Sequence, residues 1–177
     1  MTFQYDVVAG RTSGAFPGAL TQPNQPKEIV SALPYASNPP VRYGDPVVLL
    51  SNGNIRPVGA GDTMAGVTLY GFLVLSYPTQ QLVWPPIGFS NIVGGVPTGD
   101  TLSVLREGYI AVQVGSGTPA IGAPVYARTI SHSGVNTVVG SLDAAADGAN
   151  NFAITGVEWA KNGVDSNGFG EIRARIA

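Results

Sequence analysis

Few residues in this 177-residue chain have side chains suited to acid–base, nucleophilic or metal chemistry. His132 is the only histidine, it lies in a Ser-His-Ser-Gly stretch between two predicted strands, and cysteine is absent. A Ser-His-Asp site needs a carboxylate that orients the imidazole, and the spacing of Asp143 and Asp147 does not assign that role to either. One histidine without cysteine does not supply the usual zinc ligands. We therefore predict no enzymatic activity, no cofactor and no metal.

Two acidic turns and two glutamates are the remaining candidates for chemistry. Residues 165–168 (Asp-Ser-Asn-Gly) and the pair Asp143 and Asp147 offer oxygen ligands in turns. Neither has the ligand number or the closing glutamate of a calcium loop, and these residue types are also ordinary in turns. Glycoside hydrolysis would need two acids facing one cleft, and the sequence does not pair Glu107 with Glu158. These residues predict turns and solvated faces.

Charge is sparse, which restricts the kinds of partner. Only 11% of the residues are charged, against about 25% in average proteins. Such a surface is more typical of a protein partly covered by other subunits. Nine basic and eleven acidic residues give a net charge of −2 without a basic run, so we predict no nucleic-acid partner. The start of the chain has no secretion-signal pattern, and residues 67–75, the most apolar stretch, are too short for a membrane helix. We therefore predict no membrane partner.

Short β-strands must position these residues. Residues 44–58 predict a strand, an Asn52-Gly53 turn and a return strand. Asn-Gly favours a type I′ turn, because both of its central residues need positive φ. Residues 99–114 repeat this pattern, with Gly108 in the place of Gly53, and predict a second hairpin.

Further strand patterns complete an all-β chain. Residues 66–76 form an apolar stretch typical of a strand buried on both faces. Residues 142–150 are the only helix candidate, with Asp143 as its N-cap. The other predicted strands are 122–130 and 134–140, a looser third hairpin, and 151–160 and 170–176, where Ile172, Ala174 and Ile176 alternate with Arg173 and Arg175. We predict a single antiparallel β-sandwich or barrel, jelly-roll-like, with at most one short helix.

Residues 1–40 differ from the rest of the chain and predict an extended arm before a β domain at 41–177. Six prolines in this segment exclude a helix or a central strand. A disordered tail is the alternative, but such tails contain few apolar residues, and this segment has Phe3, Tyr5, Phe16 and Tyr35 among others. We expect the arm to lie on a partner surface.

Residues 77–98 form a long aromatic connection. A loop of this length in a compact domain is usually functional or disordered, and Trp84 could also cap the end of the core. We predict an anchor for a protein partner, because tryptophan and tyrosine are enriched at binding hot spots. The predicted partner-binding residues are Phe3, Tyr5, Phe16, Tyr35, Tyr77, Trp84 and Phe89.

The chain resembles a known family over residues 41–176. Residues 41–67 (VRYGDPVVLLSNGNIRPVGAGDTMAGV) resemble the core signature of tailed-bacteriophage head cement and decoration proteins, and 122–128 (GAPVYAR) and 154–160 (ITGVEWA) resemble its second half. The Pro-rich start is similar to the arms that such proteins lay over the shell. This resemblance implies a non-enzymatic structural virion protein that is made in the host cytoplasm. It would bind the capsid exterior through the major capsid protein and form a homo-dimer or homo-trimer.

Two other functions are alternatives to a cement protein. A carbohydrate- or receptor-binding β module of a phage fibre or adhesin would use Trp84 and Trp159 as stacking platforms, but it would leave the arm unexplained. A small hydrolase on a β scaffold has too few candidate residues. The sparse charge, the arm and the β core favour a cement protein that stabilises the capsid lattice through interface burial.

Overall fold

The computed structural model describes residues 17–22, 24–38, 42–74, 101–131 and 138–176, and this part of the chain is almost entirely β. All the strand pairs are antiparallel, which confirms the predicted fold class. The strands are β1 (Glu28–Ala32), β2 (Pro46–Leu49), β3 (Ile55–Pro57), β4 (Thr68–Leu73), β5 (Leu102–Gln113), β6 (Pro124–Arg128), β7 (Leu142–Asp143), β8 (Asn151–Trp159) and β9 (Phe169–Arg175).

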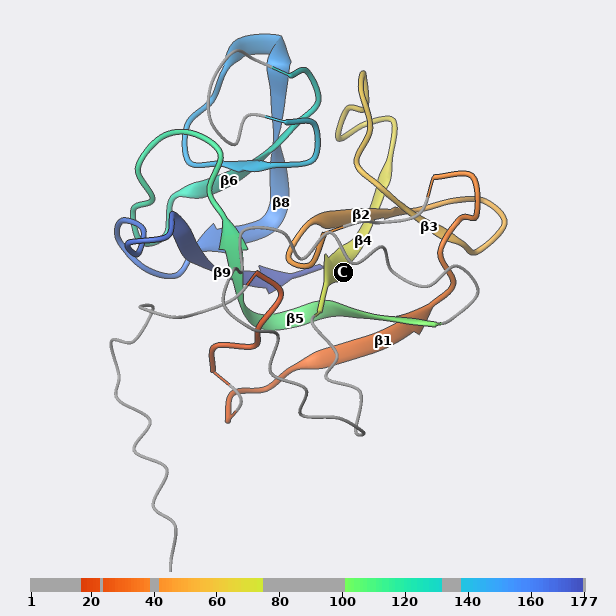
Figure 1. Cartoon of the computed structure of the whole chain (residues 1–177), viewed down its shortest axis with the longest axis horizontal. Helices are drawn as coiled ribbons and strands as arrows, with labels where there is room; N and C mark the ends of the chain where they lie inside the picture. Colours follow the sequence, from red (N-terminus) through yellow and green to blue (C-terminus); the bar gives the residue numbers. More distant parts are fainter. Residues whose placement is uncertain (1–16, 23, 39–41, 75–100, 132–137, 177) are drawn as a thin grey trace, which may run out of the picture.

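The nine strands form one sheet that is organised around β5. Their order is β3-β2-β4-β5-β9-β8-β6-β7, with β1 also paired to β5. In Figure 1, β5 runs across the lower half with β1 below it, while β6, β8 and β9 lie towards the upper left and β2, β3 and β4 towards the upper right. The sheet therefore has two wings that share one long strand.

Each wing curls back until its pairing closes. On one side Ile55 of β3 forms a parallel bridge with Pro34, two residues beyond the end of β1. Ile55 N donates to Leu33 O and Tyr35 N donates to Ile55 O, both at 2.8 Å. On the other side Val114, directly after β5, bridges to Leu142 of β7. The result is two small rings of strands, β5-β4-β2-β3-β1 and β5-β9-β8-β6-β7.

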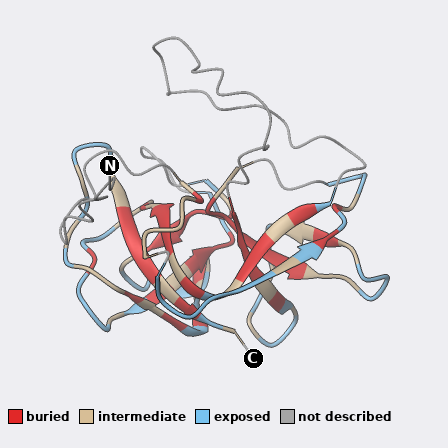
Figure 2. Ribbon diagram, turned by 90° about the horizontal axis from the view of Figure 1, so that it is seen from below, coloured by how far each residue is buried: buried red, intermediate tan, exposed pale blue. Residues whose placement is uncertain are grey.

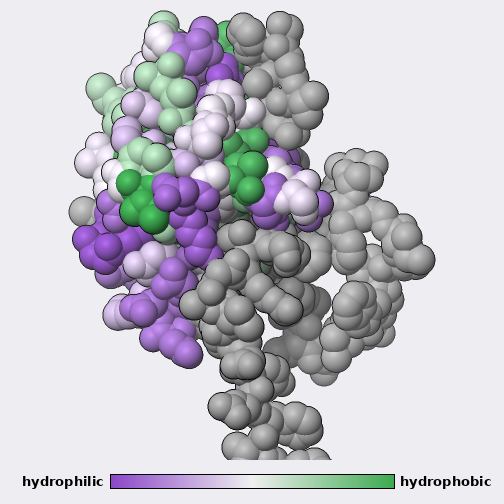
Figure 3. Space-filling view, turned by 90° about the vertical axis from the view of Figure 1, so that its left-hand side faces the viewer, coloured by the Kyte–Doolittle hydropathy of each residue, from purple (hydrophilic) through white to green (hydrophobic). Residues whose placement is uncertain are grey.

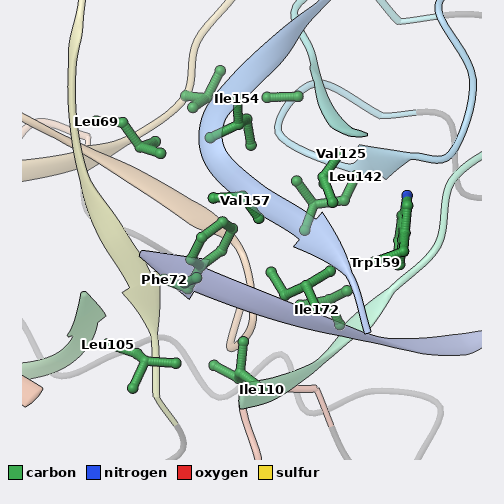
Figure 4. Close-up of a cluster of buried hydrophobic side chains, with 14 of the residues drawn as sticks. Leu69, Phe72, Leu105, Ile110, Val125, Leu142, Ile154, Val157, Trp159 and Ile172 are labelled. Atoms are coloured by element: carbon green, nitrogen blue, oxygen red, sulfur yellow. The ribbon is translucent and has the colours of Figure 1, made fainter. Parts of the chain in front are cut away.

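Neighbouring residues on the shared strands enter two different cores, because successive side chains of a strand point to opposite faces. Val104 and Leu73 pack in a first core with Ile55, whereas Leu105 and Phe72 pack in a second one. Figure 4 shows this second core between the wings, where side chains of β4 approach those of β8. Strand β4 is thus buried on both faces, as its sequence predicts. Buried residues lie inside both wings, and exposed residues lie mainly in the turns (Figure 2).

The first predicted hairpin is present, but its turn differs in type. Gly53 N donates to Leu50 O at 2.9 Å, and Leu50 N donates to Asn54 O at 2.8 Å. Ser51 and Asn52 are therefore the central residues, and Gly53 follows them with a φ of 82°. This is a three-residue loop in which a glycine bulge follows the turn, not the predicted two-residue type I′ turn.

The second predicted hairpin is wrong. Residues 102–113 form one continuous strand, β5, and Gly108 lies within it with a φ of 132°. The β1 register shifts at this point, from Glu28 opposite Glu107 to Ile29 opposite Leu105. A Cβ on Gly108 would approach Lys27 Cβ to 3.2 Å. Arg106 is the residue without a partner in β1, so Gly108 lies beside a bulge and under a closely packed neighbour, a common place for glycine inside a strand.

The predicted short helix and the third hairpin also need correction. Leu142 and Asp143 form β7, and the helical part is a 3-10 turn, η2 (Gly148–Asn150). Asp143 does not cap a helix because its carboxylate binds Arg128. The strand that returns along β6 is β7 and not 134–140, of which 134–137 lie outside the described residues.

The described part of the predicted arm follows β5. Leu20 bridges to Ile110, and Gly18 N donates to Ala111 O at 2.8 Å. Farther along the chain, β1 pairs with the first half of β5. Residues 18–22 and 24–32 therefore cover one edge of β5. The remaining arm residues, 1–16, 23 and 39–40, lie outside the described residues.

A buried ionic network holds β6, β7 and β8 together. Arg128 is 2% exposed, and its guanidinium lies 2.8 Å from Asp143 and 2.9 Å from Asp147. Asn151 Nδ2 donates to Asp143 Oδ2 at 3.0 Å. Burial by itself would lower the pKa of Arg128, but the hydrogen bond to Asp147 and the charge of Asp143 outweigh burial and raise it. Arg128 thus remains charged inside the ring.

Candidate partner-binding surface

Tyr35 is the one predicted partner-binding residue within the described part of the chain. It is half-buried beside the bridge that closes the first ring. Its backbone is therefore fixed while part of its side chain faces solvent. The other predicted residues, Phe3, Tyr5, Phe16, Tyr77, Trp84 and Phe89, lie outside the described residues.

The acidic candidates of the sequence have internal roles. Asp165 Oδ1 accepts hydrogen bonds from the backbone N–H groups of Asn167 and Phe169, both at 2.9 Å, so it caps its own turn. Asp143 and Asp147 are paired with Arg128 in the buried network described above. These carboxylates are thus used in holding the fold. His132 lies outside the described residues.

Glu107 and Glu158 belong to the outer face of β5, β9 and β8. Strand pairing sets Glu107 opposite Arg175, and it sets Arg173 between Tyr109 and Glu158. Arg173 lies 3.5 Å from Glu158 and 5.6 Å from the centre of the Tyr109 ring. Two arginines thus separate the two glutamates, which do not form the facing pair that hydrolysis needs.

An open groove of about 300 Å³ lies on this outer face. Residues 154–157 of β8 lie opposite Val125 alone in the β6 pairing, so β8 bulges away from β6. Gly156 has a φ of 78°, and a Cβ there would collide with the Arg175 carbonyl. The close backbone approach needs glycine, and the missing side chain leaves room above it. The groove is lined by Gly122, Pro124, Gly156, Val157, Glu158, Arg173 and Arg175.

The sequence pattern correctly predicts that Arg173 and Arg175 face outward, but it does not identify the groove. The available signal was the pair of arginines on the solvent face of a strand in a chain with little charge. Gly156 inside the predicted strand 151–160 is a signal for a bulge, but the sequence does not show which neighbouring strand lies beside it. The pairing and register of β6, β8 and β9 bring the residues of the groove together.

Trp159 cannot serve as a stacking platform for a sugar. Its side chain is 0% exposed, and it packs in the second core near Ile172 and Leu142 (Figure 4). This overturns half of the proposed aromatic pair of the carbohydrate-binding alternative. Trp84, the other half, lies outside the described residues.

Exposed apolar residues occur on several different turns and strands. They include Ile121, which is 66% exposed, next to Gly122 of the groove. The turns at 116–122 and 161–168 lie at the left of Figure 1, and on the corresponding side in Figure 3 small hydrophobic areas lie between strongly hydrophilic ones. The large described apolar residues that are exposed are Ile29, Leu33, Ile121, Ile130, Val138 and Val164.

Arg42 forms an ion pair within its own wing and a hydrogen bond to the other wing. Arg42 Nε lies 2.7 Å from Asp45 Oδ2, and Arg42 Nη2 donates to Val139 O at 3.4 Å. Asp45 directly precedes β2, whereas Val139 precedes β7. Burial raises the pKa of Asp45 from 3.8 to about 6, although Arg42 acts in the opposite direction.

Asp45 is expected to make the protein less stable as the pH rises from about 4 to 6. The folded state holds the Asp45 proton more tightly than the unfolded chain, so its stabilising effect is present at low pH and is lost through this range. The difference in free energy of unfolding between wild type and Asp45→Asn should fall by up to about 3 kcal/mol between pH 4 and 7. Urea unfolding of both proteins at both pH values measures it. Parallel pH profiles would contradict the expectation.

The described ranges contain neither a membrane-spanning helix nor a cluster of metal-ligating side chains. No helix there is long and apolar enough to cross a membrane. Within the same ranges, no three His, Cys, Asp or Glu side chains gather as possible metal ligands.

Comparison with known proteins adds two similarities. A family model described as structural cement protein (E217 gp24/Pam3 gp6) matches residues 3–175. A chain of a solved structure, "The capsid of Myoviridae Phage XM1", is 16% identical and has a TM-score of 0.64, with both chains covered completely. At this identity the structure shows a similarity of fold alone. No curated protein matches this chain.

Proposed function

The chain belongs to the structural cement proteins of phage capsids, and on this premise we propose that it binds the outer surface of an assembled head through the major capsid protein. It stabilises the shell there by burying surface across shell subunits. A specific contact usually hides about 800 Å² per partner. Several such contacts per molecule add through multivalency.

One structural observation carries this proposal: most charged side chains of the described residues form ion pairs with one another. Ion pairs join Arg56 to Asp62 at 2.7 Å and Lys161 to Glu171 at 2.6 Å, besides the pairs named above. A surface whose charges are internally paired suits a broad, largely uncharged interface. The same pairing leaves few acids for acid–base catalysis, which supports a non-enzymatic role.

The thermal rupture of heads tests the proposal. Because bound subunits stabilise only the assembled shell, heads that carry the protein should rupture at a higher temperature than heads without it. The shift should grow with protein concentration and change little with salt, since the interface is mainly apolar and polar. Equal rupture temperatures with and without the protein would refute the cement role. Loss of binding by orders of magnitude at high salt would refute the uncharged interface.

We also propose the aromatic residues of the sequence analysis as anchors, with Trp84, Tyr77 and Phe89 foremost. Trp84→Ala should weaken binding to heads by about 2 kcal/mol if Trp84 is a hot spot. Ile130→Ala, a truncation of an exposed apolar side chain outside the groove, is the matched control. Titration of heads with labelled protein measures both variants, and equal affinities would exclude Trp84 as an anchor.

The proposed active form is a small homo-oligomer, a dimer or a trimer. A low-charge surface is typical of a protein partly covered by other copies or partners. Light scattering of the purified protein distinguishes the states. A monomer at all concentrations would exclude the proposed oligomer in solution.

A further inference from the structure

We propose that the groove on the outer face of β6, β8 and β9 binds a carboxylate of an acidic segment of the shell protein. This inference rests on the proposed function, because it names the chemistry of one contact in that interface. The groove combines two guanidinium groups with a single carboxylate, Glu158. The lining of the groove therefore carries a net charge of +1.

Arg175 is the residue that lacks an internal partner. It is exposed, and no carboxylate in the described part of the chain forms an ion pair with it. Glu107 lies opposite it in the strand register without bonding to it. In a chain that pairs most of its charges internally, this guanidinium is available for an incoming anion.

Arg173 is held ready beside it. Glu158 lies 3.5 Å from its guanidinium, and the Tyr109 ring supports the same group from β5. Arg173 is paired with β5 on one side and with β8 on the other, and Arg175 is paired with β5, so the backbone spacing of the two arginines is fixed before binding. A guanidinium held in place beside a second, exposed one suits bidentate recognition of a carboxylate.

The rest of the groove favours a peptide over a phosphate chain. Val157, Pro124 and Gly122 supply apolar lining, and Ile121 is 66% exposed directly before Gly122. An apolar residue next to the acidic residue of the shell segment would pack against this lining. Glu158 would repel a second negative charge on the ligand. A nucleic acid carries a row of phosphates, so it would be repelled by Glu158 and by a chain whose net charge is −2.

One neutralising variant and one variant that keeps the positive charge test the site. Arg175→Gln should weaken binding to heads by on the order of tenfold, because it removes the free donor pair, whereas Arg175→Lys should recover only part of the loss. Ser51→Glu is the control, since it changes the net charge by the same −1 at an exposed turn of the other wing. Its binding should equal that of the wild type. Unchanged binding of Arg175→Gln, or an equal loss for Ser51→Glu, would overturn the inference.

A peptide probe separates this inference from the proposed function. A hexa-aspartate peptide should perturb the amide resonances of residues 122–124, 156–158 and 173–175 in the isolated protein, and hexa-asparagine should not. If wild-type protein fails to bind heads but these resonances shift, the proposed function fails and the carboxylate site stands. If heads bind and the peptide shifts none of them, the site fails alone. Stronger shifts from a short DNA strand than from the peptide would also overturn the inference.

Discussion

Replacement of Arg128 by alanine is expected to lower the free energy of unfolding by about 3–5 kcal/mol. The substitution leaves the Asp143 carboxylate, which is 0% exposed, without the cation that lies 2.8 Å away. Asn151 Nδ2 would remain as a donor to that carboxylate, but a neutral amide does not neutralise the charge. Urea unfolding, followed by circular dichroism, measures the loss.

Two variants make this result specific to the buried charge. Arg106→Ala removes a more exposed arginine, 3.4 Å from Glu28, and should cost no more than about 1 kcal/mol. Combining Arg128→Met with Asp143→Leu removes both buried charges and should recover much of the stability lost in Arg128→Ala. If Arg128→Ala and Arg106→Ala destabilise equally, the network does not hold the ring together.

Removal of residues 1–32 is expected to destabilise the chain by several kcal/mol, whereas removal of 1–16 should change its stability by less than about 0.5 kcal/mol. The longer deletion strips β1 and residues 18–22 from β5 and exposes its apolar edge. It also removes Gln22, whose Nε2 donates to Glu171 Oε1 at 2.8 Å. Glu171 is 0% exposed, so it would lose a hydrogen bond at a buried charge.

Urea unfolding and binding to heads should be measured on both truncated chains. We expect the chain that lacks 1–16 to unfold like the full chain and to bind heads more weakly, because the sequence assigns partner contacts to Phe3, Tyr5 and Phe16. If both truncated chains unfold at the same urea concentration as the full chain, β1 and residues 18–22 do not stabilise the fold by pairing with β5. This experiment also tests whether the folded domain begins at residue 41, as the sequence predicts, or near Pro17.

Local patterns predicted the strands well and the turns less well. Period-2 alternation predicts β9, where Ile172 and Ala174 are both 0% exposed. Gly53 and Gly108 occupy matching positions in similar sequences, yet one follows a turn and the other lies beside a bulge within a strand. Both places use the same conformational freedom, so the glycine cannot reveal which one applies. The difference comes from Lys27, which packs against Gly108 from a distant part of the sequence.

Long-range pairing also explains why the site was only partly predictable. The outward direction of Arg173 follows from alternation, but its neighbours Tyr109 and Glu158 come from strands whose register the sequence does not specify. The burial of Glu171 depends in the same way on Gln22 and Lys161. From sequence alone, an acidic residue such as Glu171 in a half-buried strand is predicted to face solvent, because the partners that allow its burial are distant in the chain.

The sharing of β5 by both rings affects how the chain can fold. Ile110 bridges to Leu20, far earlier in the chain, and pairs with Ile172, far later. Neither ring can form from a local segment, so loop-closure entropy must be overcome before most contacts form. A topology of such high contact order typically folds in roughly milliseconds to seconds. During that time β4 and β5 expose apolar side chains on both faces, and aggregation competes with folding until β9 has paired.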